Sequence, residues 1–216
     1  IPVWQLIRVT REPERVKNQL GEQAERLLSG ALGPRRQNAR VNRIGSRLAR
    51  SARIEVEFFV LPGPMINAVS LPHGQVYIWQ GLLGHTAEDD EMLAGVLAHE
   101  LGHVVLDHHL RAYEFSAQLS LLFGALGRPW LRGLSRNLVN RIVQRGFSRS
   151  REWEADETAI ELMDAAGFGA RGLVRLFETL PNQGRLQGML GTHPDPKHRA
   201  LRLREILGEL PQTEEK

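Results

Sequence analysis

The chain has 216 residues, of which 42% are hydrophobic and 25% are charged, and its formal net charge is +3. This is the composition of a soluble globular domain that can bury one core. The absence of cysteine excludes disulfides and thiolate metal sites, so a metal ion would need His and carboxylate ligands. Only Lys17, Lys197 and Lys216 are lysines among the 28 basic residues. Because no nucleic-acid-binding motif accompanies this arginine bias, we expect no nucleic-acid partner.

The N-terminal part of the chain is predicted to contain two helices followed by a small sheet. Helical periodicity extends over residues 12–30 and 36–52, with apolar side chains at helical spacing in the second segment. Alternating residues, many of them β-branched or aromatic, predict a strand at about 53–61. Residues 65–83 are predicted to form two strands joined by a Pro/Gly turn.

A long helix is predicted from Thr86, a candidate N-cap, to about residue 110. Acidic residues crowd its first turn, where the helix dipole favours negative charge. Its middle, MLAGVLAHELGHVVL, is apolar on most faces, so we expect this helix to be buried. Further helices are predicted at 111–124, 130–146, 149–166, 170–180 and 196–208. The order of helices, a small sheet and more helices indicates an α+β fold that is mainly helical.

Residues 98–107 of the long helix read AHELGHVVLD. His99 and His103 lie one turn apart on one helical face, so their imidazoles can bind one zinc ion together. Glu100 lies about 100° further round the helix, where a carboxylate can act as a general base on a water without being a ligand. A single histidine on an apolar helix is usually a satisfied core residue. Two of them flanking a glutamate fit that alternative poorly, because an unpaired buried carboxylate is costly.

A catalytic zinc site usually takes a third protein ligand and keeps one open position. Glu152 and Asp156 are four residues apart on the helix predicted at 149–166. Glu152 could ligate the metal, and Asp156 could accept the second N–H of a metal-bound histidine and so fix its tautomer. The spacing alone leaves an alternative equally open, a solvated acidic helix start beside Arg149 and Arg151.

Two further histidines follow the motif directly. At about 100° per residue, His108 faces away from His99 on a continuous helix. We therefore expect His108 and His109 to have structural or surface roles. Asp107 lies closer to the side of Glu100 and His103, where it could orient a ligand.

Four segments carry a resemblance to a known family. They are NAVSLPHGQVYIWQGLL (67–83), LAHELGHVVLDH (97–108), SREWEAD (150–156) and THPDPKHR (192–199). In this order they resemble the HtpX/CAAX-prenyl-endopeptidase family of zinc metallopeptidases, most closely its Oma-type and periplasmic members, which are soluble or singly anchored. The chain lacks the membrane helices of the integral members, which argues against processing of prenylated peptides.

The resemblance implies a zincin-like fold with one Zn²⁺ held by His99, His103 and Glu152, and with Glu100 as the general base. It also implies that His193, in a Gly/Pro-rich loop, approaches the metal. There His193 would stabilise the oxyanion, or would ligate the metal as a plug that holds the enzyme inactive. Without the resemblance, His193 is an ordinary loop histidine.

The resemblance further implies that the segment 74–80 is an edge strand that borders the active site. An edge strand can bind an extended peptide by strand addition, which uses backbone hydrogen bonds and demands little side-chain specificity. The alternative for any one of its side chains is a place in the core. The residues proposed to form this substrate strand are Gly74, Val76, Tyr77 and Ile78.

These features predict a zinc-dependent endopeptidase that acts on unfolded or membrane-associated polypeptides in the cell envelope or periplasm. The alternative is a latent or plugged zinc-containing binding or holdase module in envelope protein quality control. We expect an N-terminal helical segment over residues 1–53, a metallopeptidase domain over 54–210 and a tail over 211–216.

Membrane association is a separate question. Arginines recur at spacing four between residues 128 and 149, interleaved with apolar side chains, which suits docking on an anionic membrane surface. A solvated helical face is the more common reason for such a stripe. The apolar run 115–127 is too short to cross a bilayer. The start at Ile1 without Met is compatible with a processed or truncated form that has lost an N-terminal anchor.

Overall fold

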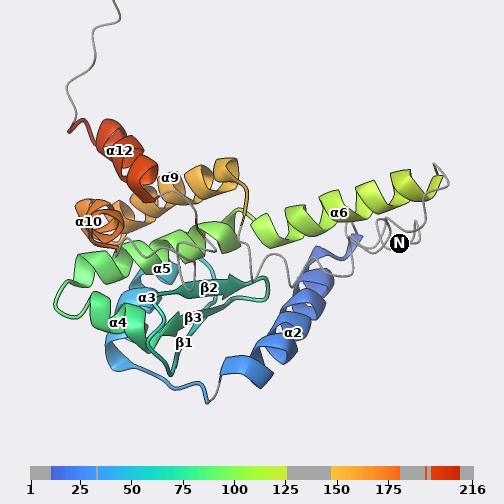
Figure 1. Cartoon of the computed structure of the whole chain (residues 1–216), viewed down its shortest axis with the longest axis horizontal. Coiled ribbons are helices and arrows are strands. Elements are labelled where there is room, and N and C mark those ends of the chain that lie inside the picture. Colours follow the sequence, from blue (N-terminus) through green and yellow to red (C-terminus); the bar gives the residue numbers. More distant parts are fainter. Residues whose placement is uncertain (1–10, 33, 126–146, 181–192, 194–195, 210–216) are drawn as a thin grey trace, which may run out of the picture.

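The computed structural model describes residues 11–32, 34–125, 147–180, 193 and 196–209. It confirms an α+β fold that is mainly helical, with one small sheet (Figure 1). The described helices are α2 (Pro13–Leu32), α3 (Ala39–Ala52), α4 (Gln80–His85), α5 (Asp90–Val105), α6 (His108–Ala125), α9 (Arg149–Ala165), α10 (Arg171–Thr179) and α12 (Pro196–Ile206). The strands are β1 (Glu57–Leu61), β2 (Ala68–Leu71) and β3 (Gln75–Trp79).

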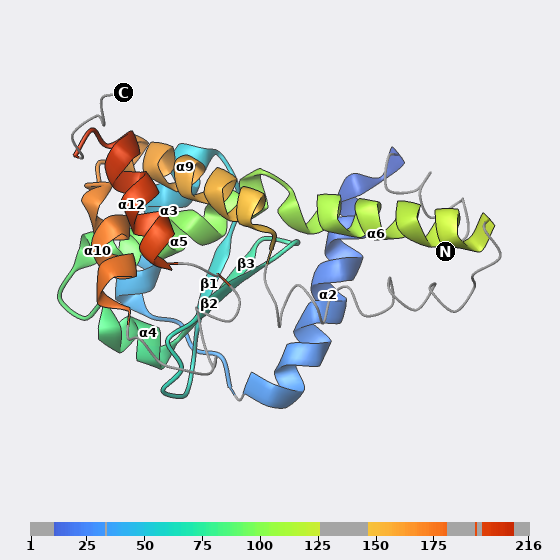
Figure 2. The ribbon, with the colours of Figure 1, turned by 45° about the horizontal axis from the view of Figure 1, so that its top comes forward.

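The helix that carries the HELGH motif is the centre of the molecule. All residues of α5 from Met92 to His103 are buried. The helix packs on one side against β2 and β3, and on others against α3, α9 and α10 (Figures 1 and 2). A helix that is apolar all round needs such burial on every face. The motif therefore lies in the core, between the sheet and the layer of C-terminal helices.

The sheet has the strand order β1-β3-β2. β3 pairs in parallel with β1 and antiparallel with β2, so it is the central strand. The expectation that residues 74–80 form an edge strand is therefore wrong, because β1 pairs with one side of β3 and β2 pairs with the other. Alternation along a strand indicates which side chains are buried, but it does not indicate strand order. The edge strand that borders α5 is β2.

The long helix predicted from Thr86 to about residue 110 is interrupted at both ends. Its N-cap is Asp89, whose side chain accepts a hydrogen bond from the backbone N–H of Met92. Thr86 instead ends the short helix α4, and its hydroxyl donates to the carbonyl oxygen of Leu82. At the other end Asp107 has a φ of 51°, so the first helix is broken there and α6 begins at His108.

Other predicted boundaries agree more closely. The helices α9, α10 and α12 lie within two residues of the predicted bounds. The predicted strand at 53–61 is shorter, since Arg53 adopts the left-handed conformation that ends α3 and β1 begins only at Glu57. The helix predicted at 130–146, and with it most of the arginine-rich stretch, lies outside the described residues.

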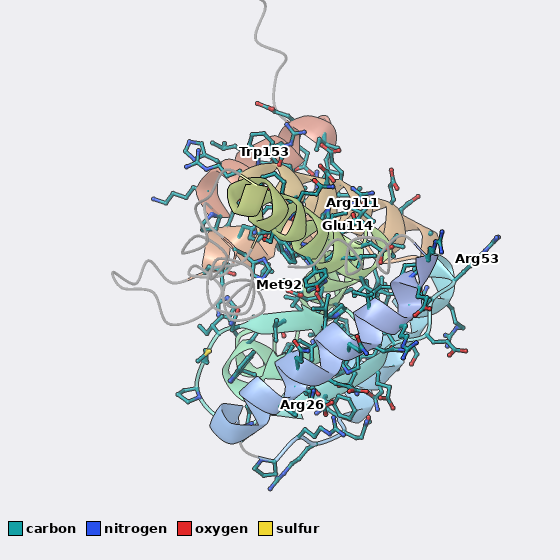
Figure 3. All side chains as sticks on the ribbon, turned by 90° about the vertical axis from the view of Figure 1, so that its right-hand side faces the viewer. Arg26, Arg53, Met92, Arg111, Glu114 and Trp153 are labelled. Atoms are coloured by element: carbon teal, nitrogen blue, oxygen red, sulfur yellow. The ribbon has the colours of Figure 1, made fainter. Side chains whose placement is uncertain are left out.

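The N-terminal helix α2 contacts α6 at one flank of the protein. Val16 and Leu20 of α2 pack against Leu110 and Tyr113 of α6. Figure 3 shows the two helices together, with Arg26 on α2 and with Arg111 and Glu114 on α6. The helix α3, by contrast, belongs to the main core with α5. The proposed division of the chain after residue 53 stays a prediction. Among the helices in the described part of the chain, none combines the length and apolar character needed to cross a membrane.

A glycine lets α9 approach α5 beside the motif. A Cβ added to Gly102 would lie 2.8 Å from the carbonyl oxygen of Ala155 and 3.1 Å from its Cα. Because Ala155 lies between Glu152 and Asp156 on α9, this contact sets how closely both carboxylates approach the histidines of α5.

We expect Gly102→Ala to lower the free energy of unfolding by about 1–3 kcal/mol, the usual cost of overpacking a core. The backbone of Ala155 cannot move aside without shifting α9. Gly84→Ala is the matched control, because among the described residues no atom lies within 4 Å of a Cβ added there. Alanine at that helical position should be neutral or should stabilise by up to about 1 kcal/mol. Urea unfolding of both variants measures the difference, and equal stabilities would contradict the packing argument.

Candidate metal centre

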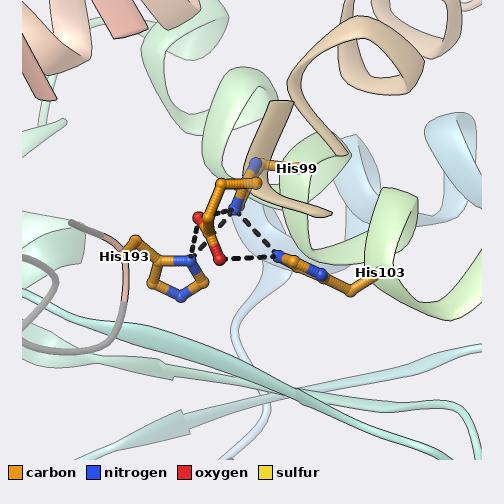
Figure 4. A group of neighbouring side chains, drawn as sticks. His99, His103 and His193 are labelled. Atoms are coloured by element: carbon orange, nitrogen blue, oxygen red, sulfur yellow. Dashed lines mark hydrogen bonds and ion pairs between the residues drawn. The ribbon is translucent and has the colours of Figure 1, made fainter. Parts of the chain in front are cut away.

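Three elements bring four side chains to one buried point. His99 and His103 come from α5, Glu152 comes from the first turn of α9, and His193 lies a few residues before α12. One ligand atom of each residue lies within 4.8 Å of those of the other three. All four side chains are buried. Figure 4 shows the three imidazoles turned toward one another, above the strands of the sheet.

The distances within this group are those of donors that face a common centre. Nε2 of His99 lies 3.1 Å from Nε2 of His103 and 3.4 Å from Oε2 of Glu152. The other carboxylate oxygen of Glu152 lies 3.6 Å from Nε2 of His103. Nδ1 of His193 lies 2.9 Å from Glu152 and 3.1 Å from His99. Each imidazole therefore presents a nitrogen to the same small volume.

The chemistry of these donors fits a divalent cation. Among the described residues, the buried Oε1 of Glu152 has no hydrogen-bond partner, and a buried carboxylate oxygen without a partner is costly. Burial, the largest effect, lowers the pKa of His103 well below its ordinary value, so this imidazole is neutral, as a metal ligand must be. Imidazole nitrogens and one carboxylate are ligands that zinc takes in proteins.

The pKa of His193 also indicates that this point requires positive charge. Burial alone would lower that pKa, but the carboxylates of Glu152 and Glu100 raise it to about 10. Nε2 of His193 lies 3.3 Å from Oε1 of Glu100, on the side opposite to Glu152. Either an imidazolium or a bound cation can neutralise the two buried carboxylates.

Glu100 lies beside the group of ligands and is anchored by the edge strand. Its Oε2 accepts a hydrogen bond of 2.8 Å from the backbone N–H of Ser70 in β2. Burial would raise the pKa of Glu100, but His193 lowers it below the ordinary value, with contributions from His99 and the Ser70 N–H. The carboxylate is therefore ionised and held with one oxygen fixed.

Asp156 and Arg199 lie outside the group of four possible ligands but contact two of its members, His99 and Glu152. Oδ1 of Asp156 lies 2.9 Å from Nδ1 of His99, as the spacing on α9 predicted for a group that orients a ligand. Arg199 donates to both carboxylate oxygens of Asp156, at 2.7 and 2.6 Å, and its Nη1 lies 3.1 Å from Glu152. Burial would raise the pKa of Asp156, but Arg199 holds it below its ordinary value.

Sequence reasoning missed the role of Arg199, which is 1% exposed and lies over the ring of Phe177. Nothing in its local spacing pairs Arg199 with Asp156, 43 residues away. The feature of the sequence that could have indicated this role is the position of Arg199 in the segment THPDPKHR (192–199), six residues after His193.

The two histidines after the motif are also closer to the site than predicted. His108 is fully buried, and its Nδ1 lies 2.8 Å from Nδ1 of His103. His109 donates from Nε2 to the carbonyl oxygen of Ser70. Both side chains are buried, which agrees with one of the two roles expected for them, a structural role. The continuous helix on which the predicted direction of His108 rested is not present, because the chain turns at Asp107. Asp107 itself faces α2, where it pairs with Lys17 at 3.2 Å.

The residues expected to form the substrate strand do not place their side chains in the candidate metal centre. Val76, Tyr77 and Ile78 are buried within the central strand, and Gly74 forms the turn before it with a φ of 83°. The backbone that borders the site belongs to Ser70 of β2, whose N–H and carbonyl groups are bound by Glu100 and His109.

Comparison with known proteins identifies the family. Residues 35–207, which include every residue of the metal centre, match the model of Peptidase family M48. The chain belongs to peptidase family M48. Membership makes the protein a metalloprotease and confirms the resemblance seen in the sequence. It also implies a metal ion, and the buried group of His99, His103, Glu152 and His193 is suited to bind one.

Three similar proteins show how widely this M48 domain is shared. Metalloprotease YcaL of Escherichia coli is 30% identical over 184 residues, covering 76% of this chain and 70% of YcaL. The beta-barrel assembly-enhancing protease of Yersinia pestis is 32% identical over 180 residues, covering 74% of this chain and 36% of that protein. The mitochondrial metalloendopeptidase OMA1 of Arabidopsis thaliana is 32% identical over 149 residues, or 68% of this chain and 30% of OMA1. The chain thus spans only about a third of the latter two.

Proposed function

We propose that this M48 protein is a zinc endopeptidase in which His99, His103 and Glu152 hold one zinc ion and Glu100 is the general base. The observation that carries the proposal is the convergence of four buried ligand atoms beside an ionised glutamate. A zinc ion bound there would polarise a water molecule and the scissile carbonyl group.

Glu100 has the geometry that a general base needs. The Ser70 N–H holds Oε2, which leaves Oε1 directed toward the interior of the site, 3.3 Å from Nε2 of His193. Oε1 would take a proton from the attacking water and pass it to the leaving amine. Because Ser70 lies on the edge strand β2, the same strand is suited to align an extended substrate chain next to Glu100.

His193 is proposed either to stabilise the oxyanion through Nε2 or to occupy a metal position through Nδ1. We expect His193→Ala to change casein turnover by at least about tenfold. A fall in turnover with zinc affinity preserved would assign the oxyanion role. A rise in turnover with weaker zinc binding would assign the role of a plug.

The control for this variant is His198→Ala, because His198 is an exposed histidine five residues further along the chain. Turnover and zinc affinity are measured for both variants. If His193→Ala matches the control in both quantities, neither role holds.

We further propose that the substrates are unfolded or membrane-associated polypeptides of the cell envelope. The name of one relative, a beta-barrel assembly-enhancing protease, supports an envelope setting. Peripheral or tethered association with a membrane is part of the same proposal.

The second candidate is a plugged holdase that binds chains and seldom cleaves them, and it rests only on the place of His193 among the possible ligands. The experiment that separates the two is incubation with casein, with and without a metal chelator. Chelator-sensitive cleavage supports the endopeptidase, whereas casein that is bound but left intact supports the holdase.

A further inference from the structure

We infer that His108 is a positioning residue for the metal ligand His103, and that Glu154 in turn orients His108. The inference rests on the proposed metal centre, since it concerns how one of the ligands is held. It assigns a role to two residues that lie outside the HELGH motif and are not themselves ligands.

A continuous series of hydrogen bonds connects the partly exposed Glu154, through His108, to the ligand His103. Oε2 of Glu154 lies 3.2 Å from Nε2 of His108. Nδ1 of His108 lies 2.8 Å from Nδ1 of His103, whose Nε2 faces the other ligands. Both His103 and His108 are fully buried, whereas the Glu154 side chain is 48% exposed.

The direction of each hydrogen bond follows from metal binding. When His103 ligates through Nε2, its proton is on Nδ1, so Nδ1 must donate. His108 must then accept on its own Nδ1, which places its proton on Nε2. From there His108 donates to the carboxylate of Glu154. In this arrangement every nitrogen of the two imidazoles has a partner, and the lone pair of His103 is directed at the metal.

The other histidine of the motif, His99, is also oriented by a carboxylate, but without a second imidazole between them. Nδ1 of His99 lies 2.9 Å from the carboxylate of Asp156, with no residue between them. His103 has no carboxylate at that position among the described residues, and His108 spans the gap to Glu154. Each histidine of the motif thus has a carboxylate anchor, one direct and one through a second imidazole.

The surroundings favour positioning over simple packing. Phe147 stacks on the His103 ring, with centroids 4.3 Å apart and planes 21° from parallel. It also contacts the ring of His108, with centroids 5.6 Å apart. The stacked ring limits tilting of His103, but rotation within the plane of the ring is opposed by the hydrogen bond to His108. A buried apolar residue at position 108 would keep the packing and lose that hydrogen bond.

The test compares His108→Leu with His108→Asn. Leucine fills similar space without an acceptor, whereas asparagine places an amide oxygen near the position of Nδ1. We expect His108→Leu to weaken zinc binding about 10- to 100-fold, the usual cost of losing an outer partner of a metal ligand. His108→Asn should retain an affinity close to that of the wild type. Zinc affinity is measured by competition with a chromophoric chelator, and the absorption spectrum of the cobalt-substituted protein reports the geometry at the metal.

A surface variant keeps the test independent of folding. Glu154→Ala should weaken zinc binding about tenfold, the lower end of that range, because water can partly replace an exposed carboxylate. The matched control is Glu157→Ala on the same helix, since Glu157 is similarly exposed, at 47%, and is paired with Arg202 rather than with a histidine. It should bind zinc like the wild type.

The outcomes distinguish this inference from the proposed function. A wild-type protein that binds no zinc would overturn the metal centre and the inference together. Stoichiometric zinc in the wild type, with equal affinity in His108→Leu, would overturn the inference alone. So would an asparagine variant as weak as the leucine variant. If His108→Leu does not fold, equal affinities of Glu154→Ala and Glu157→Ala would contradict the inference.

Discussion

Glu100→Gln is expected to stop peptide hydrolysis while leaving metal binding intact. The amide oxygen can still accept the hydrogen bond from the Ser70 N–H, so the side chain keeps its place. The amide cannot take a proton from water, and loss of a positioned general base costs about 10²- to 10⁴-fold in rate. Casein turnover and bound zinc per chain are the two quantities to measure.

A suitable control for Glu100→Gln is Glu91→Gln. Glu91 lies on the same helix but pairs with Arg175, away from the metal centre. It should keep both turnover and zinc. If Glu100→Gln, purified free of other proteases, cleaves casein as fast as Glu91→Gln, Glu100 is not the general base.

Glu152→Ala is expected to lose zinc and, with it, casein cleavage. Removing a ligand should lower zinc affinity by more than the roughly 10- to 100-fold that follows removal of a residue hydrogen-bonded to a ligand. The change also leaves Arg199 without one of its two buried carboxylate partners. Zinc affinity and casein turnover should therefore fall together, and excess zinc should restore turnover only at concentrations far above those that saturate the wild type.

Thermal unfolding in the presence of a chelator separates ligand loss from misfolding. Glu161→Ala, which removes an exposed glutamate of the same helix, is the matched control. Glu152→Ala should unfold cooperatively, as the control does, but without the stabilisation that zinc gives the control. A Glu152→Ala protein with wild-type zinc affinity would show that another group completes the site.

Local periodicity predicted much of the fold, because helices and strands are determined largely by nearby residues. The all-round apolar character of the HELGH helix predicted its burial, and α9, α10 and α12 begin and end near their predicted bounds. The turn at Asp107 was missed because no glycine or proline marks it; an aspartate adopts the left-handed conformation there. The strand order could not be predicted from local pattern either, since it depends on the last strand, β3, lying between β1 and β2.

The same division applies to the site. Spacing on one helix predicted that His99 lies beside His103 and that Glu152 and Asp156 share a face of α9. In the structure Glu152 lies near both histidines, and Asp156 contacts His99. Groups that reach the site across long sequence separations were missed. Arg199 contacts Asp156 from α12, Phe147 covers His103 from the segment before α9, and His108 reaches His103 only because the helix ends between them.

The central claim is that this buried group binds one zinc ion that peptide hydrolysis requires. The most direct measurement is a zinc titration of the metal-stripped wild-type protein, with bound zinc and casein turnover followed in the same samples. We expect turnover to rise in proportion to bound zinc and to level off at one ion per chain. Turnover that is unchanged by stripping, or a folded protein that binds no zinc at any point of the titration, would contradict the account.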